Sequence, residues 1–144
     1  LFACDISPKA LEVASKNISQ YKLNKQIQLE CGSLLTPFSG QLRFDIIIAN
    51  LPYLGTDDMN SLPASVAQYE PETALSGGEN GSDLVFSLLE QSQERLNPQG
   101  VILLEVQPSI IDAVTEKAET LFPDASVSIL HDLSDTKRYI SIEA

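Results

Sequence analysis

The sequence predicts an α/β fold, in which helices cover both faces of a mostly parallel sheet. Strand-like apolar segments alternate along the chain with segments whose apolar residues recur at helical spacing. One of the strand-like segments, 44–49, is an apolar run of the kind that is buried on both faces of a sheet. The chain has 144 residues, of which 43% are hydrophobic, so we expect one compact domain over residues 1–144.

The first third of the chain is expected to hold three strands and one helix. The helix begins with Pro8 in its first turn, Ser7 is in position to cap it, and Asn24 marks its exit. Its apolar face is formed by Leu11, Ala14, Ile18 and Tyr21. The strands are expected at 1–4, 27–31 and 44–49.

The rest of the chain is expected to begin with a long connection and to end with two paired strands. Segment 50–81 contains several prolines and glycines, which predicts that it is mostly loop, and loops of this length usually serve a site. Ser82 or Asp83 can cap a helix that runs to about Leu96 and is stopped by residues 97–100. A strand at 101–106, a helix from Pro108 to Pro123 and strands near 127–130 and 138–142 follow. The connection between the last two strands is too short for a crossover, so they should pair antiparallel.

The charge distribution disfavours a nucleic-acid partner. The formal net charge is −11, and no Lys, Arg or His lies between Arg43 and Arg95. A phosphate backbone needs cationic partners, so we expect no direct binding of nucleic acid. No apolar run is long enough to cross a bilayer, and the two cysteines lack a metal-type spacing. We therefore expect a cytoplasmic protein without membrane contact and without a metal.

The tetrapeptide Asn50-Leu51-Pro52-Tyr53 carries the strongest chemical signal. An amide or aromatic amine nitrogen is a poor nucleophile because its lone pair is delocalised, and two acceptors that hold its hydrogens can orient that lone pair. The Asn50 side-chain oxygen and the Leu51 carbonyl are candidate acceptors, since Pro52 favours an extended Leu51. Tyr53 can stack on the planar group. No base is available in this segment, so the chemistry must rest on positioning; the alternative is a plain strand exit.

Asp5 is a candidate ligand for a ribose. It ends the first strand just before a helix, and from this position a carboxylate can accept both hydrogen bonds of a ribose diol. The alternative is an aspartate that stabilises the helix start at Ser7 and Pro8. Ile6 would be an apolar floor for an adenine ring, or merely part of the core.

These residues resemble known methyltransferase motifs. The tetrapeptide resembles the signature of amino-group methyltransferases, whose usual form is Asn-Pro-Pro-Tyr. A second block resembles the HemK/PrmC family, which methylates the glutamine of the Gly-Gly-Gln motif in peptide-chain release factors. That block consists of Tyr69-Glu70-Pro71, Ala74-Leu75, Gly77-Gly78, Gly81 and Asp83, and the match continues through residues 96–100, Leu104-Glu105, Asp132 and Arg138. The glycines of the second block are expected mainly to permit tight turns.

The resemblance implies a Rossmann-like class I methyltransferase fold, a three-layer sandwich with an antiparallel last strand. It also implies S-adenosyl-L-methionine as cofactor, glutamine N-methylation as activity and a release factor as protein partner. Carried over singly, Asn50 and the Leu51 carbonyl would hold the glutamine amide next to the cofactor, with Pro52 shaping the turn and Tyr53 packing on the amide. The cofactor would lie against Asp5, Ile6, Ser33, Leu34 and Asn50, with Asp5 at the ribose and Ser33 near the adenine.

The sequence departs from the family pattern at three points. Leu51 replaces the family's first proline, as in ribosomal-RNA adenine dimethyltransferases, and Ser33 stands where an aspartate usually reads the adenine. No Gly-x-Gly-x-Gly loop exists, and residue 1 lies within what resembles the family's second strand. The resemblance thus implies an N-terminally truncated domain that lacks its central first strand and has little or no activity alone. An adenine methyltransferase acting on RNA or DNA, a nicotinamide-dependent dehydrogenase and a non-catalytic remnant of the fold remain alternatives.

Overall fold

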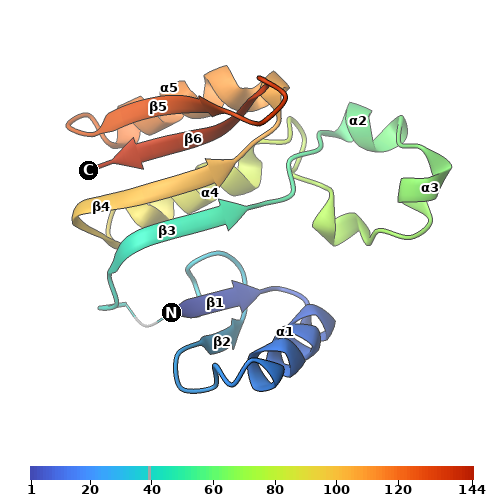
Figure 1. Cartoon of the computed structure of the whole chain (residues 1–144). Coiled ribbons are helices and arrows are strands. Elements are labelled where there is room, and N and C mark those ends of the chain that lie inside the picture. Colours follow the sequence, from blue (N-terminus) through green and yellow to red (C-terminus); the bar gives the residue numbers. More distant parts are fainter. Residues whose placement is uncertain (39) are drawn as a thin grey trace. The chain divides into compact units, whose positions relative to one another are not determined.

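The chain forms two compact units in a computed structural model that describes residues 1–38 and 40–144 (Figure 1). The first unit is Leu1–Leu42 and the second is Arg43–Ala144. Both units combine strands and helices, as an α/β fold requires. The expectation of one domain over 1–144 stays a prediction.

The first unit is a strand–helix–strand motif. Strand β1 (Phe2–Asp5) pairs in parallel with β2 (Gln28–Cys31), and helix α1 (Pro8–Gln20) connects them. The Ser7 hydroxyl accepts a hydrogen bond from the Ala10 N–H at 3.3 Å, so the predicted cap is confirmed. The helix ends four residues before the predicted exit at Asn24, and two turns complete the connection.

The second unit contains a four-stranded sheet in the order β3-β4-β6-β5. Its strands are β3 (Phe44–Asn50), β4 (Leu96–Glu105), β5 (Ser126–His131) and β6 (Lys137–Glu143). Strands β3 and β4 are parallel, whereas β6 is antiparallel to both β4 and β5. The predicted antiparallel pairing of the last two strands is confirmed.

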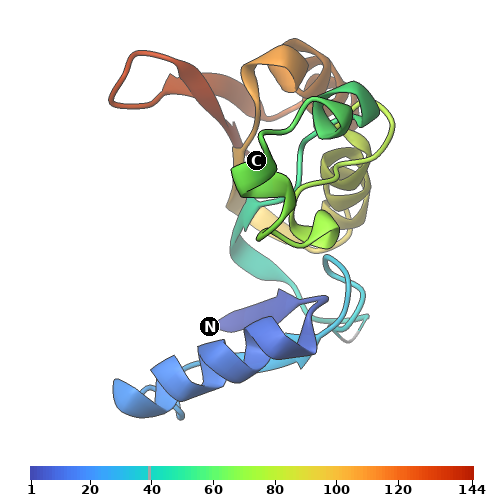
Figure 2. The ribbon, with the colours of Figure 1, turned by 90° about the vertical axis from the view of Figure 1, so that its right-hand side faces the viewer.

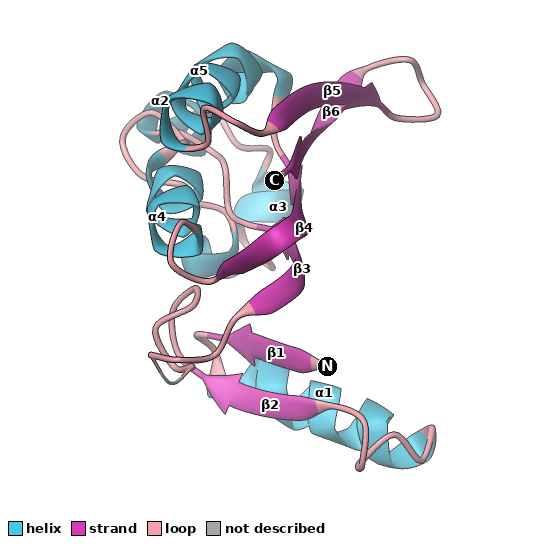
Figure 3. Ribbon diagram, turned by 90° about the vertical axis from the view of Figure 1, so that its left-hand side faces the viewer, coloured by secondary structure: helices cyan, strands magenta, loops and turns pink. Residues whose placement is uncertain are grey.

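Helices α4 (Asp83–Ser92) and α5 (Ile111–Leu121) lie on one side of this sheet (Figure 3). A short 3₁₀ helix, η2 (Pro108–Ile110), leads into α5. Their apolar faces and the sheet enclose the core, whose side chains are at most 2% exposed: Val85, Leu88, Leu89, Ile102, Leu104, Val106, Ile111, Val114, Ala118, Ile140 and Ile142. Burying side chains of this kind contributes roughly 1.5–3 kcal/mol each, so this face supplies most of the unit's stability.

The prediction that β3 is buried on both faces is wrong for this structure. Ile47 points into the core and is 6% exposed, but its neighbours Ile46 and Ile48 are 62% and 73% exposed. Successive side chains of a strand point to opposite faces, and the described helices of this unit cover one face only. The apolar run therefore predicted the strand correctly but not the burial of its outer face.

Segment 50–81 is more helical than predicted. It contains α2 (Thr56–Asn60), α3 (Ala64–Ala67) and a 3₁₀ helix, η1 (Glu72–Ala74). Pro63 and Pro71, which favoured a loop, stand immediately before α3 and η1, where a missing N–H costs nothing. Residues 51–82 form an arm that extends beyond the carboxyl ends of β3 and β4 (Figures 1 and 2).

The boundary between α4 and β4 also differs from the prediction. The helix ends at Ser92 instead of Leu96, and β4 begins at Leu96 instead of Val101. Leu96 is buried at 6% exposure and pairs with Phe44 on β3, which draws the chain into the sheet early. Residues 97–100 therefore lie within β4 and form an irregularity near its start, with Gln99 in the left-handed region at φ 65°.

Candidate active site

The Asn50-Leu51-Pro52-Tyr53 tetrapeptide leaves the carboxyl end of β3. Asn50 is the last residue of the strand, paired in register with Glu105 on β4, and its side chain is exposed. Neither the Asn50 side chain nor the Leu51 carbonyl oxygen has a hydrogen-bond partner among the described residues. Two adjacent acceptors are therefore available at a strand end. Pro52 and Tyr53 are half-buried.

Glycines from the far end of the arm pack against the backbone of this tetrapeptide. The Leu54 N–H donates to the Leu75 carbonyl at 3.0 Å, and the Gly77 N–H donates to the Leu54 carbonyl at 2.9 Å. A Cβ atom on Gly77 would lie 2.6 Å from the Pro52 carbonyl oxygen and 2.7 Å from the Tyr53 Cα. One on Gly81 would collide with the Tyr53 carbonyl oxygen. Only glycine allows the two ends of the arm to approach each other this closely.

The predicted role of these glycines in tight turns is confirmed for two of the three. Gly78 and Gly81 do adopt left-handed φ angles of 98° and 79°. Gly77 has no such angle, and the close approach of backbone alone requires it. Spacing in the sequence gives no signal for that contact, because it joins residues 25 positions apart, Pro52 and Gly77.

Gln107 connects the end of β4 to the arm. Its Nε2 donates to Asp58 Oδ2 of α2 at 3.4 Å. Its Oε1 is the one buried side-chain oxygen or nitrogen without a partner within the described part of the chain. Gln107 follows the carboxyl end of β4, the edge of a parallel sheet at which ligands usually bind, but no sequence motif marks it as a site residue.

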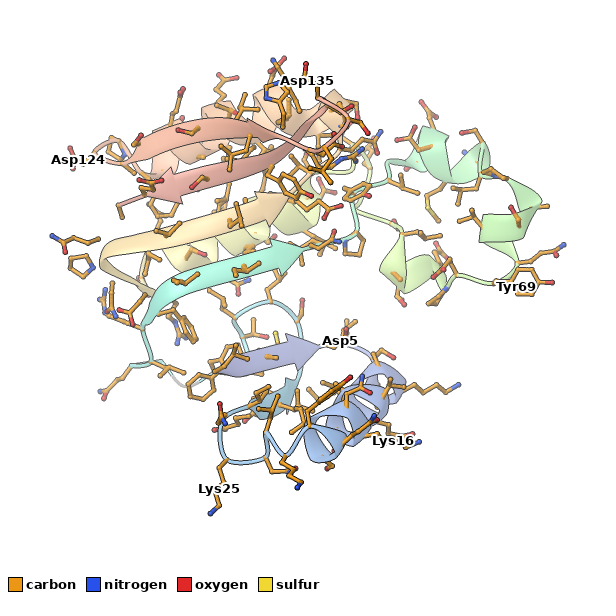
Figure 4. All side chains as sticks on the ribbon, viewed as in Figure 1. Asp5, Lys16, Lys25, Tyr69, Asp124 and Asp135 are labelled. Atoms are coloured by element: carbon orange, nitrogen blue, oxygen red, sulfur yellow. The ribbon has the colours of Figure 1, made fainter. Side chains whose placement is uncertain are left out.

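The predicted ribose ligand, Asp5, lies at the carboxyl end of β1, next to the start of α1 (Figure 4). The carboxylate is exposed, and its Oδ1 accepts a hydrogen bond from the Ser7 N–H at 2.7 Å. The alternative role of Asp5, stabilising the start of α1, therefore uses only one of its two carboxylate oxygens. A carboxylate has about four acceptor positions, so Oδ2 and part of Oδ1 remain available to a diol.

The predicted adenine residues form a strained turn at the same edge of the first unit. The Gly32 N–H donates to the Asp5 carbonyl at 3.1 Å, which joins the turn to β1. Leu34 has a φ of 54°, a region that a bulky side chain rarely adopts. The Cys4 thiol donates to the Leu34 carbonyl at 2.9 Å, and burial, with a smaller effect of Asp5, raises the pKa of this thiol and keeps it protonated. Strain of this kind is common at ligand sites.

The structure thus brings the predicted residues together in two groups. Asp5, Ile6, Ser33 and Leu34 share one edge of the first unit, where Ile6 is 61% exposed. Residues 50–53 lie at the corresponding edge of the second unit. No group of His, Cys, Asp and Glu that could hold a metal occurs within residues 1–38 and 40–144. Over the same ranges, no helix is long and apolar enough to cross a membrane.

Comparison with curated proteins gives similarity along most of the chain. A release factor glutamine methyltransferase from Rhodopirellula baltica is 30% identical over 141 residues, 98% of this chain and 48% of that protein. A ribosomal protein uL3 glutamine methyltransferase from Bradyrhizobium diazoefficiens is 38% identical over 104 residues, 72% of this chain and 32% of that protein. The predicted resemblance to glutamine methyltransferases of the HemK/PrmC type is confirmed. No family model matches the sequence.

The solved structures agree on the fold. A methyltransferase from Pyrococcus furiosus aligns with a TM-score of 0.67 and 18% identity, over 99% of this chain and 61% of that one. A Streptococcus mutans protein, described as a candidate methyltransferase and solved in complex with SAH, aligns at 0.61 and 15% identity, over 99% of this chain and 74% of that one. The fold is that of class I methyltransferases, as predicted. The chain spans at most about half the length of the glutamine methyltransferases it matches.

Proposed function

We propose that this chain is part of an S-adenosylmethionine-dependent methyltransferase that methylates the side-chain amide of a protein glutamine. The observation that carries the proposal is the pair of unpartnered acceptors, the Asn50 side chain and the Leu51 carbonyl, at the end of β3. The names of the similar proteins support glutamine as the acceptor. A release factor with a Gly-Gly-Gln motif is the preferred substrate, and the protein would act in the cytoplasm, where translation takes place.

The two acceptors suit the chemistry of an amide nitrogen. The Asn50 oxygen and the Leu51 carbonyl would each accept one N–H of the glutamine amide, turning its lone pair toward the methyl group. Tyr53 would pack against the amide plane and limit its rotation. Held in this way, the amide nitrogen would accept the methyl group that the cofactor supplies when bound, and one N–H proton of the amide would leave to water. Positioning and local electrostatics supply the acceleration.

The first unit offers groups that fit the nucleoside end of the cofactor. When bound, S-adenosylmethionine supplies a methyl group on a positively charged sulfur. The free oxygen of Asp5 suits a ribose diol, and the exposed Ile6 suits one face of an adenine ring. Ser33 and Leu34 lie in the turn that is bonded to the same strand end. The 144-residue sequence contains no Gly-x-Gly-x-Gly motif, so we expect this chain alone to bind the cofactor weakly.

The names of the relatives and the charge of the chain bear on which molecule is methylated. Relatives are named for either release factors or ribosomal protein uL3, and both names specify a glutamine. The acidic character of the arm and of the start of α4 argues against an adenine in RNA or DNA. No Lys, Arg or His lies between Arg43 and Arg95, whereas six acidic residues do: Asp57, Asp58, Glu70, Glu72, Glu79 and Asp83.

The test is methyl transfer from radiolabelled cofactor by the longest native polypeptide that contains this chain. A release factor, uL3 and total RNA serve as parallel acceptors, and mass spectrometry locates the label. We expect Asn50→Ala to lower the rate about a hundredfold or more while cofactor affinity, measured by calorimetry, stays nearly unchanged. Asn60→Ala, at the exposed end of α2, is the matched control and should keep the full rate.

Two of the alternatives have distinct outcomes in this test. Label on RNA instead of protein would establish the adenine methyltransferase. Cofactor binding without transfer to any acceptor, or no binding at all, would favour a non-catalytic remnant. An unchanged rate for Asn50→Ala would remove this residue from the mechanism.

A further inference from the structure

We propose that Asp83 is a positioning residue that holds the amide-binding tetrapeptide in place through the glycine turn of the arm. This inference rests on the proposed function, because it concerns the same two acceptors. From the sequence, Asp83 was a possible helix cap and a member of the second block of the family resemblance, with no role in the site.

The Asp83 side chain stabilises the turn instead of capping its helix conventionally. Its Oδ2 accepts a hydrogen bond from the Glu79 N–H at 3.1 Å, and its own N–H donates to the Gly77 carbonyl at 3.0 Å. The carboxylate occupies the space in which a side chain on Gly78 would lie. Ser82, the residue at the cap position, makes no capping bond with its side chain. Asp83 therefore joins the turn to the start of α4 through one bond of its carboxylate and one of its backbone N–H.

The glycine turn at residues 77–81 also sets the path of the chain after Leu51. Gly77 is bonded to the Leu54 carbonyl, and the Thr56 N–H donates to the Glu79 carbonyl at 3.1 Å. Gly77 and Gly81 also lie against the Pro52 and Tyr53 backbone with no room for a side chain. Releasing the turn would let this segment relax, and the Leu51 carbonyl would lose its fixed direction.

A purely structural role for Asp83 can be separated from this one. Asp83 is in the first turn of α4, where a negative charge stabilises the helix by about 0.3–1 kcal/mol. Asp112 is likewise exposed in the first turn of α5. Among the described residues, its side chain makes no hydrogen bond to the arm. Asp112→Ala is therefore a control that removes the same helix-end charge and leaves the turn intact.

The experiment measures kcat, the KM for the protein acceptor and cofactor affinity for Asp83→Ala, Asp83→Asn, Asp112→Ala and Asn50→Ala in the native enzyme. We expect Asp83→Ala to lower kcat about tenfold or more with unchanged cofactor affinity. Asp83→Asn should restore most of the rate, because its amide oxygen can accept the Glu79 N–H. Asp112→Ala should lower the unfolding midpoint slightly and keep kcat.

The failure of this inference differs from the failure of the proposed function. Full kcat in folded Asp83→Ala, or an equal loss in Asp83→Asn, overturns the positioning role while an inactive Asn50→Ala still upholds the function. Full kcat in Asn50→Ala overturns the function itself. Asp83→Leu fills similar space without an acceptor and replaces Asp83→Ala if that variant does not fold; full activity in it would equally overturn the inference.

Discussion

Replacing Gly77 by alanine tests whether the packing of the arm controls the chemistry. Gly77 is buried, and its Cα faces the backbone on two sides. An added Cβ would lie 2.5 Å from the Gly81 carbonyl oxygen, 2.6 Å from the Pro52 carbonyl oxygen and 2.7 Å from the Tyr53 Cα. All three neighbours are backbone atoms, so none can rotate away as a flexible side chain would.

The size of the effect follows from these distances. An ordinary van der Waals contact begins near 3.4 Å, so the Pro52 carbonyl oxygen must retreat by about 0.8 Å. A displacement of about 1 Å in a positioning group can cost about a hundredfold in rate, which is the loss we expect for Gly77→Ala. Overpacking should also destabilise the fold by about 1–3 kcal/mol. Cofactor affinity should not change, since the predicted ribose and adenine residues belong to the first unit.

The assay compares Gly77→Ala with Gly40→Ala, whose added Cβ would meet nothing within 4 Å. Single-turnover methyl transfer reports the chemical step, calorimetry reports cofactor binding, and urea unfolding gives the stability loss. Measurement below the unfolding midpoint ensures that a loss of rate is not a loss of folded protein. A folded Gly77→Ala variant with the full rate would refute the argument that packing against Pro52 and Tyr53 positions the acceptors.

Two further predictions concern stability. Ile102→Ala should lower the free energy of unfolding in urea by about 2–5 kcal/mol, because this side chain is 0% exposed. Ile48 is 73% exposed on the neighbouring strand, so Ile48→Ala should lower it by about 0.5 kcal/mol or less. Equal losses would mean that the outer face of β3 is covered in solution. In the β5–β6 hairpin, hydrogen bonds from the Thr136 and Ser134 N–H groups, with a smaller effect of Arg138, lower the pKa of Asp132. The stabilisation is therefore present above the ordinary value of 3.8 and is lost as the pH falls through the lower folded value. The protection of the Thr136 amide, measured as its exchange rate relative to the intrinsic rate at the same pH, should fall only in strong acid, and Asp132→Asn should abolish that dependence.

Local signals in the sequence predicted local structure well. Ser7 followed by Pro8 predicted the start of α1, because capping and a fixed φ act within one turn of the chain. The short link between the last two strands predicted their antiparallel pairing for a similar reason. Asn50 was expected at a strand end, and it is the last residue of β3.

Features that depend on distant residues could not be predicted in the same way. Leu96 fits a helical pattern, but its pairing with Phe44, 52 positions earlier in the chain, starts a strand there. Ile48 has the composition of a buried residue, yet its exposure depends on what covers the sheet. Pro63 predicts a break, and only the structure distinguishes a break from the first residue before a helix.

The departure at Leu51 gains a physical meaning from the contacts of the arm. In the usual Asn-Pro-Pro-Tyr signature, a ring at this position fixes φ directly, whereas Leu51 lacks that restraint and is restricted only by the following Pro52. Restriction must then come from neighbours, and the next residues, Pro52 and Tyr53, are the ones held by Gly77 and Gly81. The Leu51 carbonyl is held by neighbouring residues instead of by a proline ring, so its direction depends on each of these contacts. We therefore expect this protein to be more sensitive to substitutions at Gly77 and Asp83 than a relative that keeps both prolines.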